Sequence, residues 1–105
     1  MYKVEITGQT VRSVTRHNDG NSVMGTVGVE RVEFIFDQAW DGLLKYACFK
    51  NTGRPRNKQE VRVLLDSTNT IDIPWEMYTA SGNLYVGVCG NQGEDIVMPT
   101  IWALM

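Results

Sequence analysis

Residues 32–49 read VEFIFDQAWDGLLKYACF and contain two strand-like runs on either side of a polar corner. In the first run Val32, Phe34 and Phe36 fall on one side, which is typical of a half-buried β-strand. The second run, residues 44–49, is more apolar throughout. The corner between them is too short and too polar to form a helix. This stretch therefore predicts two strands joined by a tight corner.

Trp40 is the largest side chain in the corner, and we expect its ring to fold back between two sheets. Burying a tryptophan removes about 150–250 Å² from water, which at about 25 cal/mol per Å² gives an upper bound of about 4–6 kcal/mol. That is comparable to the net stability of a small domain, about 5–15 kcal/mol. We also expect Asp37 and Asp41 to accept backbone hydrogen bonds at the corner.

The length, composition and net charge predict one soluble globular domain, residues 1–105. Hydrophobic residues make up 43% and charged residues 21%, a balance that excludes a disordered chain. A net charge of −2 argues against nucleic-acid binding. No apolar run approaches a membrane span, and the alternating pattern that starts at Tyr2 is unlike a signal peptide. We expect synthesis in the cytoplasm and no contact with a membrane.

Short alternating runs separated by turns predict an all-β, antiparallel β-sandwich. One short helical turn is expected near 74–79, started by Pro74 and closed by Gly82. Pro99 should confine its part of the last strand to a sheet edge or a bulge. The expected strands are residues 2–7, 11–15, 23–36 with bends at Gly25 and Gly28, 43–49, 61–65, 71–73, 84–88 and 96–104.

Cys48 and Cys89 lie 41 positions apart, both in strand-like runs. In a cytoplasmic chain this pattern favours two buried thiols over a disulfide.

Four sequence blocks occur in order: residues 34–49, 73–77 (IPWEM), 82–90 (GNLYVGVCG) and 99–103 (PTIWA). Together they resemble the small β-sandwich domain of structural proteins from phages and prophages of Gram-positive bacteria. That domain is best known as the N-terminal domain of the baseplate upper protein and of related minor tail proteins. Family members usually have an aromatic residue at the position of Cys89, and they continue beyond the last block. The chain is therefore expected to be either a small virion protein or one domain of a larger one.

The resemblance implies an immunoglobulin-like sandwich without catalytic activity, cofactor or metal, which attaches a tail or baseplate component to its neighbours. The partners would be other virion proteins, and we expect a homo-oligomer. The localisation would be the virion, after synthesis in the bacterial host cytoplasm.

Large side chains at the open ends of a thin sandwich would seal its core, because the indole N–H can still reach a partner at the rim. The expected core residues are Trp40, Trp75, Trp102, Phe34, Phe36 and Phe49.

The histidine and the two aspartates of the corner give little support to a catalytic site. His17 is the only histidine and lies in a polar loop, so a solvated side chain is expected there. Asp37 and Asp41 fit a structured corner better than a carboxylate pair in a cleft.

The loop at 50–58 carries four positive charges and no negative one. Its plain interpretation is a solvated hairpin loop. The functional one is a partner-binding loop, in which Arg54, Arg56 and Lys58 steer an acidic partner subunit. DNA binding ranks below both.

Three alternatives stay open. Charged pairs at Glu30-Arg31 and Glu94-Asp95 could blunt sheet edges, and an edge left free could accept a strand from a neighbour. A head-decoration or head-fibre module would also use such a sandwich. A carbohydrate-binding module would use Trp40, Trp75 and Tyr85 as stacking faces.

Overall fold

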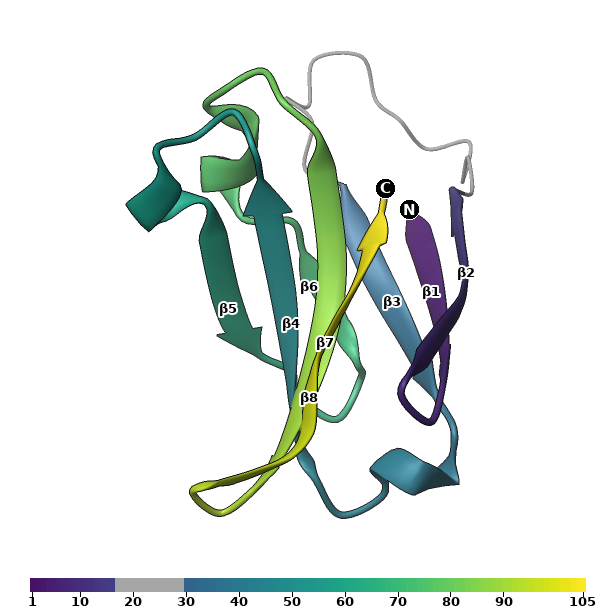
Figure 1. Cartoon of the computed structure of the whole chain (residues 1–105). Helices are drawn as coiled ribbons and strands as arrows, with labels where there is room; N and C mark the ends of the chain where they lie inside the picture. The colour runs from purple at the N-terminus through teal and green to yellow at the C-terminus, as the bar shows by residue number, and fades with distance from the viewer. Residues whose placement is uncertain (17–29) are drawn as a thin grey trace.

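The computed structural model describes residues 1–16 and 30–105 and shows an all-β sandwich of two four-stranded sheets (Figure 1). The first sheet contains β1 (Tyr2–Thr7), β2 (Thr10–Arg16), β3 (Arg31–Phe36) and β6 (Thr70–Asp72). The second contains β4 (Leu44–Asn51), β5 (Glu60–Leu64), β7 (Leu84–Gln92) and β8 (Asp95–Leu104). Three 3₁₀ turns lie between strands of the described chain: η1 (Gln38–Trp40), η2 (Arg56–Lys58) and η3 (Trp75–Tyr78).

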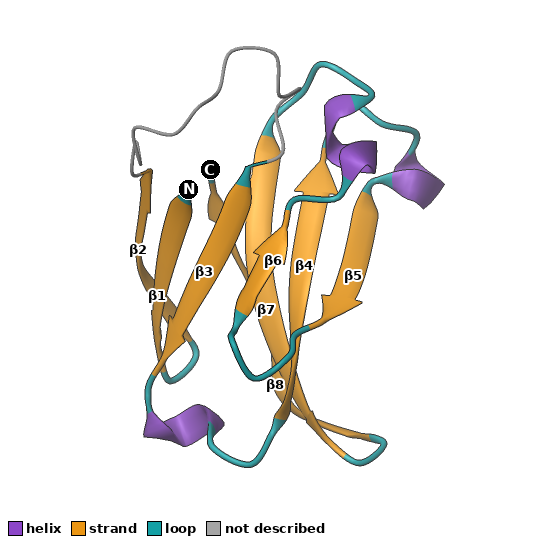
Figure 2. Cartoon of the chain, turned by 180° about the vertical axis from the view of Figure 1, so that it is seen from behind, coloured by secondary structure: helices purple, strands orange, loops and turns teal. Residues whose placement is uncertain are grey.

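The strand orders are β2-β1-β3-β6 in one sheet and β5-β4-β7-β8 in the other. All pairs are antiparallel except β1 and β3, which run parallel (Figure 2). The prediction of a purely antiparallel sandwich is therefore wrong at this pair. The reason is that β3 lies beside β1 and not beside β2, the strand before it, and β1 and β3 both run opposite to β2.

The corner between β3 and β4 ties the two sheets to the first hairpin. Trp40 has no exposed surface, and its indole Nε1 donates a hydrogen bond to the Gly8 carbonyl at 2.8 Å. Asp37 Oδ2 accepts from the Gly8 N–H at 3.0 Å, and its Oδ1 accepts from the Ala39 N–H at 3.2 Å. Both backbone polar groups of Gly8 are thus bound by the corner. Gly8 itself has φ of 55°, a left-handed conformation that glycine adopts without strain.

The corner is a single 3₁₀ turn, where the sequence predicted no helix, and Asp37 caps it. Asp41 takes part only through its backbone N–H, which donates to the Gln38 carbonyl, so its side chain does not have the predicted role.

The core lies between the sheets and centres on Trp40, Phe34 and Phe49, all buried. Phe36 is half-buried and packs on the Trp40 ring, with 5.0 Å between the ring centroids. The other buried apolar side chains come from inward positions of both sheets and from the turns: Val4, Ile6, Val32, Ala47, Leu65, Ile73, Met77, Val86 and Val88.

Two tryptophans expected in the core lie elsewhere. Trp75 is 71% exposed, because the short turn η3 points Met77 inward in its place. Trp102 is half-buried on the outer face of the second sheet, since Ile101, the residue before it, packs against the core. The prediction that these two rings plug the open ends of the sandwich is wrong.

Gly82 does not cap η3, contrary to the sequence prediction. Thr79 is the cap residue, and its Oγ1 donates to the Glu76 carbonyl at 2.7 Å. Gly82 instead allows two chain segments to approach: a Cβ built on it would lie 2.3 Å from the Gly53 nitrogen. The predicted loop at 16–22 with His17, and the bends at Gly25 and Gly28, fall mainly or wholly on residues 17–29, outside the described residues.

Replacing Trp40 by alanine should lower the free energy of unfolding by about 3–5 kcal/mol, because the change opens a cavity and leaves the Gly8 carbonyl unpaired. Chemical denaturation followed by circular dichroism measures the loss. Trp75→Ala is the matched control and should change stability by less than about 0.5 kcal/mol. A loss below about 1 kcal/mol for Trp40→Ala would contradict the placement of the ring.

Candidate functional site

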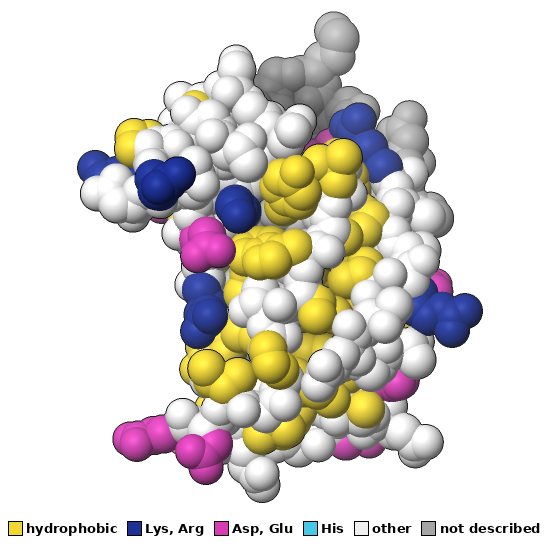
Figure 3. Space-filling view, viewed as in Figure 1, with side chains coloured by type: hydrophobic (Ala, Val, Ile, Leu, Met, Phe, Trp, Pro, Cys, Tyr) yellow, Lys and Arg dark blue, Asp and Glu magenta, His cyan; other side chains and the backbone are white. Residues whose placement is uncertain are grey.

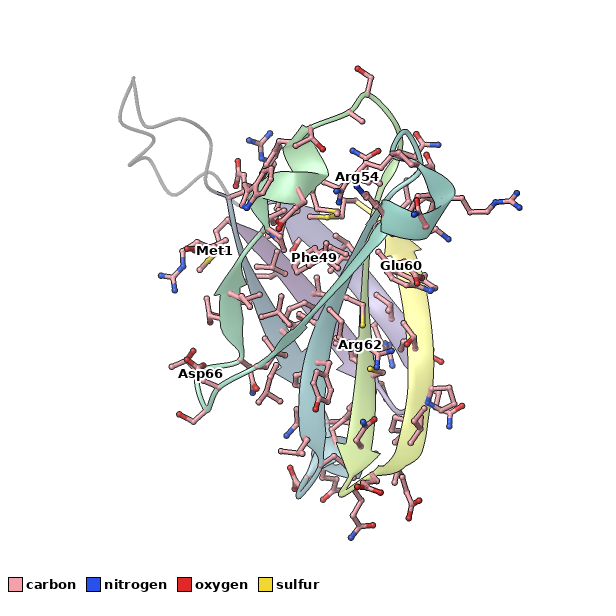
Figure 4. The ribbon with its side chains drawn as sticks, turned by 90° about the vertical axis from the view of Figure 1, so that its left-hand side faces the viewer. Met1, Phe49, Arg54, Glu60, Arg62 and Asp66 are labelled. Carbon is pink, nitrogen blue, oxygen red and sulfur yellow. The ribbon has the colours of Figure 1, made fainter. Side chains whose placement is uncertain are left out.

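The outer side of the second sheet carries many apolar side chains with a few polar ones among them, and we call the apolar set the outer apolar face (Figure 3). The strand register arranges its residues in cross-strand rows. Its members are Leu64 on β5; Leu44, Tyr46 and Cys48 on β4; Tyr85, Gly87 and Cys89 on β7; and Ile96, Trp102 and Leu104 on β8. Figure 4 shows the two sides of this sheet, with Phe49 pointing between the sheets and Glu60 and Arg62 pointing away from the core.

The outer side of the first sheet differs in kind. Its positions are mostly polar or charged, as in the alternation Lys3, Glu5 and Thr7 along β1. Arg31 and Asp72 form an ion pair across β3 and β6 at 3.1 Å. Such a face is the ordinary solvated side of an antiparallel sheet. The two outer surfaces of the sandwich are therefore unlike.

The Trp102 ring packs closely over Gly87 on the outer apolar face because Gly87 has no side chain. A Cβ at Gly87 would lie 2.9 Å from the Trp102 Cε3 atom and 2.4 Å from the Ile101 carbonyl oxygen. Lys50 Nζ lies 5.7 Å from the Trp102 ring centroid, and Arg62 Cζ lies 5.7 Å from that of Tyr46. These distances suit cation–π contacts, which at exposed sites contribute about 0.5–1 kcal/mol each.

Cys48 and Cys89 lie side by side on this face, with their sulfur atoms 3.9 Å apart. Both are buried and free, which confirms the prediction of buried thiols. Their strands set them diagonally, since Cys48 is directly opposite Gly87 and Cys89 directly opposite Tyr46. Burial, followed by the neighbouring Cys89, raises the pKa of the Cys48 thiol to about 12.

The basic loop at 50–58 begins at the end of β4 and contains η2. Arg56 and Lys58 are exposed, whereas Arg54 is half-buried and its carbonyl accepts from Gln59 Nε2 at 3.1 Å. A surface depression of about 460 Å³ adjoins the loop, lined by Lys50, Arg56, Asn57, Gln59 and Glu60. Because Glu60 faces it, the depression has mixed charge.

Asn51 joins η3 and the basic loop to the end of β4, and the sequence analysis did not predict this role. It is the one polar residue among the fully buried side chains of the described chain. Its Nδ2 donates to the Met77 and Ala80 carbonyls at 2.8 and 2.9 Å, and its Oδ1 accepts from the Gly53 N–H at 2.8 Å. A lone asparagine at a strand end carries no signal of this role in the sequence. Its bonds fix η3 and the start of the basic loop against the second sheet.

The stacking residues expected for carbohydrate binding do not form one surface. Trp40 is buried, Trp75 projects from η3, and Tyr85 is half-buried on the outer apolar face.

The sheet edges are only partly as expected. Pro99 lies on the edge strand β8, and Asp95 starts that strand. Arg31 begins β3, an inner strand, so the pair Glu30-Arg31 does not blunt an edge. Glu30 instead accepts from Arg16 Nη2 at 2.6 Å, and this contact and the N-terminal amine lower the pKa of the Glu30 carboxyl.

Within residues 1–16 and 30–105, no group of three or more His, Cys, Asp or Glu side chains is placed to hold a metal ion. The same residues contain no helix long and apolar enough to span a membrane. Comparisons of the chain with protein-family models, curated proteins and solved structures found no match.

The folded protein should lose stability as the pH rises from about 9 toward 12. Cys48 titrates near 9.0 when unperturbed and near 12 when folded, so in this range unfolding releases a proton that the folded state retains. Thermal unfolding at a series of pH values measures the slope. The variant Cys48→Ala should have a lower baseline stability but a shallower loss above pH 9, and equal slopes in the two proteins would contradict the assignment.

Proposed function

We propose that this chain is a non-enzymatic structural protein of a phage or prophage virion, a module for attachment or assembly in the tail or baseplate. The observation that carries the proposal is the set of four sequence blocks in fixed order. They fall on the end of β3, η1 and β4, on the start of η3, on β7 and on β8. The blocks therefore supply most of the second sheet and the Trp40 corner.

The immunoglobulin-like part of the proposal is supported by the strand order. The order β5-β4-β7-β8 is that of strands C′, C, F and G in immunoglobulin-like sandwiches, and β3 beside β6 corresponds to B beside E. The parallel pairing of β1 with β3 departs from that arrangement.

An attachment role is further supported by the surfaces. The outer apolar face combines aromatic side chains with cations, and aromatic residues and arginine are the types enriched in protein interfaces. The basic loop offers exposed charges at one end of the same sheet, where they would steer an acidic partner. In this proposal partners are other virion proteins and the protein acts in the virion.

Particles purified from the bacterium or phage that encodes the chain should contain it, since a structural module leaves the cell within the virion. Mass spectrometry of the particles and immunogold electron microscopy test this, with label expected at the tail tip. Gold on the capsid would favour head decoration instead. Finding the chain in the cell and not in the particles would overturn the proposal.

Reversing the exposed charges of the basic loop, Arg56→Glu with Lys58→Glu, should slow incorporation of the purified chain into particles that lack it. Charges at the rim of an interface act on the association rate more than on affinity. Wild-type incorporation should slow as salt rises, and the variant should be slow at every salt concentration. Arg12→Glu, an exposed change on β2, is the control and should incorporate at the wild-type rate. Equal rates for the loop variant and wild type would remove the loop from the docking surface.

A further inference from the structure

The second sheet is largely apolar on its outward side as well as on its inward side, although Arg62 and Asn91 also lie on the outward side. An antiparallel sheet with one solvated side alternates apolar and polar residues, as the first sheet does. On the second sheet the inward side carries Ala47, Phe49, Val86 and Val88, yet most outward positions are apolar too. Strands with apolar residues on both sides are typical of sheets that are covered on both sides.

The exposure of single side chains supports the same interpretation. Of the eight large apolar residues that are exposed in the described chain, four lie on the outer apolar face. They are Leu44 at 48%, Leu64 at 53%, Ile96 at 63% and Leu104 at 58% exposed. The outer side of the first sheet has only Ile35, at 41%. Exposed apolar surface concentrated on one side marks an interaction site.

We propose that the outer apolar face is the contact surface of a symmetric homodimer, in which a second copy of this chain packs sheet against sheet. The proposal deepens the assembly role proposed above. The dimer proposal rests on the protein's having an assembly role through protein contacts. It does not require that the assembly be a virion.

The size of the face approaches that of a stable dimer interface. With strands about 4.8 Å apart and about 3.4 Å per residue, four strands around the eight-residue β4 cover about 15–19 by 27 Å. This is about 400–500 Å² in projection, and the accessible area of side chains standing on it is larger. A stable interface buries about 800 Å² on each partner, so one sheet face approaches the required area. Sheets that pack face to face lie about 10 Å apart, with interdigitated side chains.

The charges on the face are compatible with self-pairing. They gather at one corner, where Glu60 is directly opposite Lys50 and Arg62 lies two residues further along β5. Because the corner carries both signs, a second copy is not repelled. In a two-fold contact the same patch serves both subunits, so the acid of one copy can meet a cation of the other. A corner with both signs suits a partner that carries both signs, as a second copy does, better than a partner of one strong charge, and we therefore favour a second copy.

The oligomeric state of the whole chain tests the proposal. Sedimentation equilibrium over a wide concentration range should show a reversible monomer–dimer equilibrium. Leu104→Asp places a charge on the face without touching the core, and it should raise the dimer dissociation constant at least about tenfold, as expected for a buried apolar contact. Ile35→Asp makes the same change on the opposite sheet and should leave the constant unchanged. Thermal unfolding at low concentration shows whether both variants remain folded.

A wild-type chain that stays monomeric at every concentration would overturn the proposal and leave the face to a heterologous partner. A dimer that Leu104→Asp and Ile35→Asp affect equally would also overturn it. These outcomes are independent of the particle experiment: a chain absent from virions that still dimerises through this face would refute only the virion role.

Discussion

The hydrogen bond from the Trp40 indole to the Gly8 carbonyl is the contact on which the rest of the structure depends. It is 2.8 Å long and joins residues 32 positions apart. Asp37 binds the N–H of the same glycine, so the corner between the sheets holds both backbone polar groups of one residue in the first hairpin. The largest buried side chain is thereby also hydrogen-bonded, which removes the penalty of burying its N–H. The β1–β2 hairpin, the passage from β3 to β4 and the centre of the core are fixed together.

A second constraint on the packing comes from two glycines of β7, which leave room for tryptophan rings. Gly87 lets the Trp102 ring pack closely on the outer side of the second sheet, and Gly90 leaves room for the Trp40 ring on the inner side, where a Cβ would lie 2.9 Å from its Cζ3 atom. Two glycines of one strand thus receive one tryptophan each, on opposite sides of the sheet. The inner ring stabilises the fold, and the outer ring contributes to the surface that we assign to association. In the second sheet, the side of the strand therefore decides whether an aromatic ring packs in the core or lies on the outer apolar face.

The elements that local patterns determine could be predicted from the sequence. Alternation located β1 and β2, and the polar corner located Trp40, because period-two burial is a property of the strand itself. The side on which Trp102 lies could not be predicted. The register of β7 with β8 shifts twice, near Val88 and near Gly90, and each shift changes which side successive residues face. Counting alternate residues from Met98, which packs on the core, would place Trp102 on the core side as well. The exposure of Trp75, the role of Asn51 and the pairing of β1 with β3 depend on tertiary contacts that no single segment encodes.

The placement of the three tryptophans has a spectroscopic consequence. Each occupies a different environment: Trp40 is enclosed by the core beside Phe36, Trp102 lies over a glycine under a lysine ammonium group, and Trp75 projects into solvent. Indole emission shifts to shorter wavelength when water is excluded, and a nearby cation perturbs it further. With Trp40 kept for the fold, variants that lack Trp75 or Trp102 would separate three optical reporters: one for the integrity of the interior, one for coverage of the second sheet, and one for the surroundings of η3.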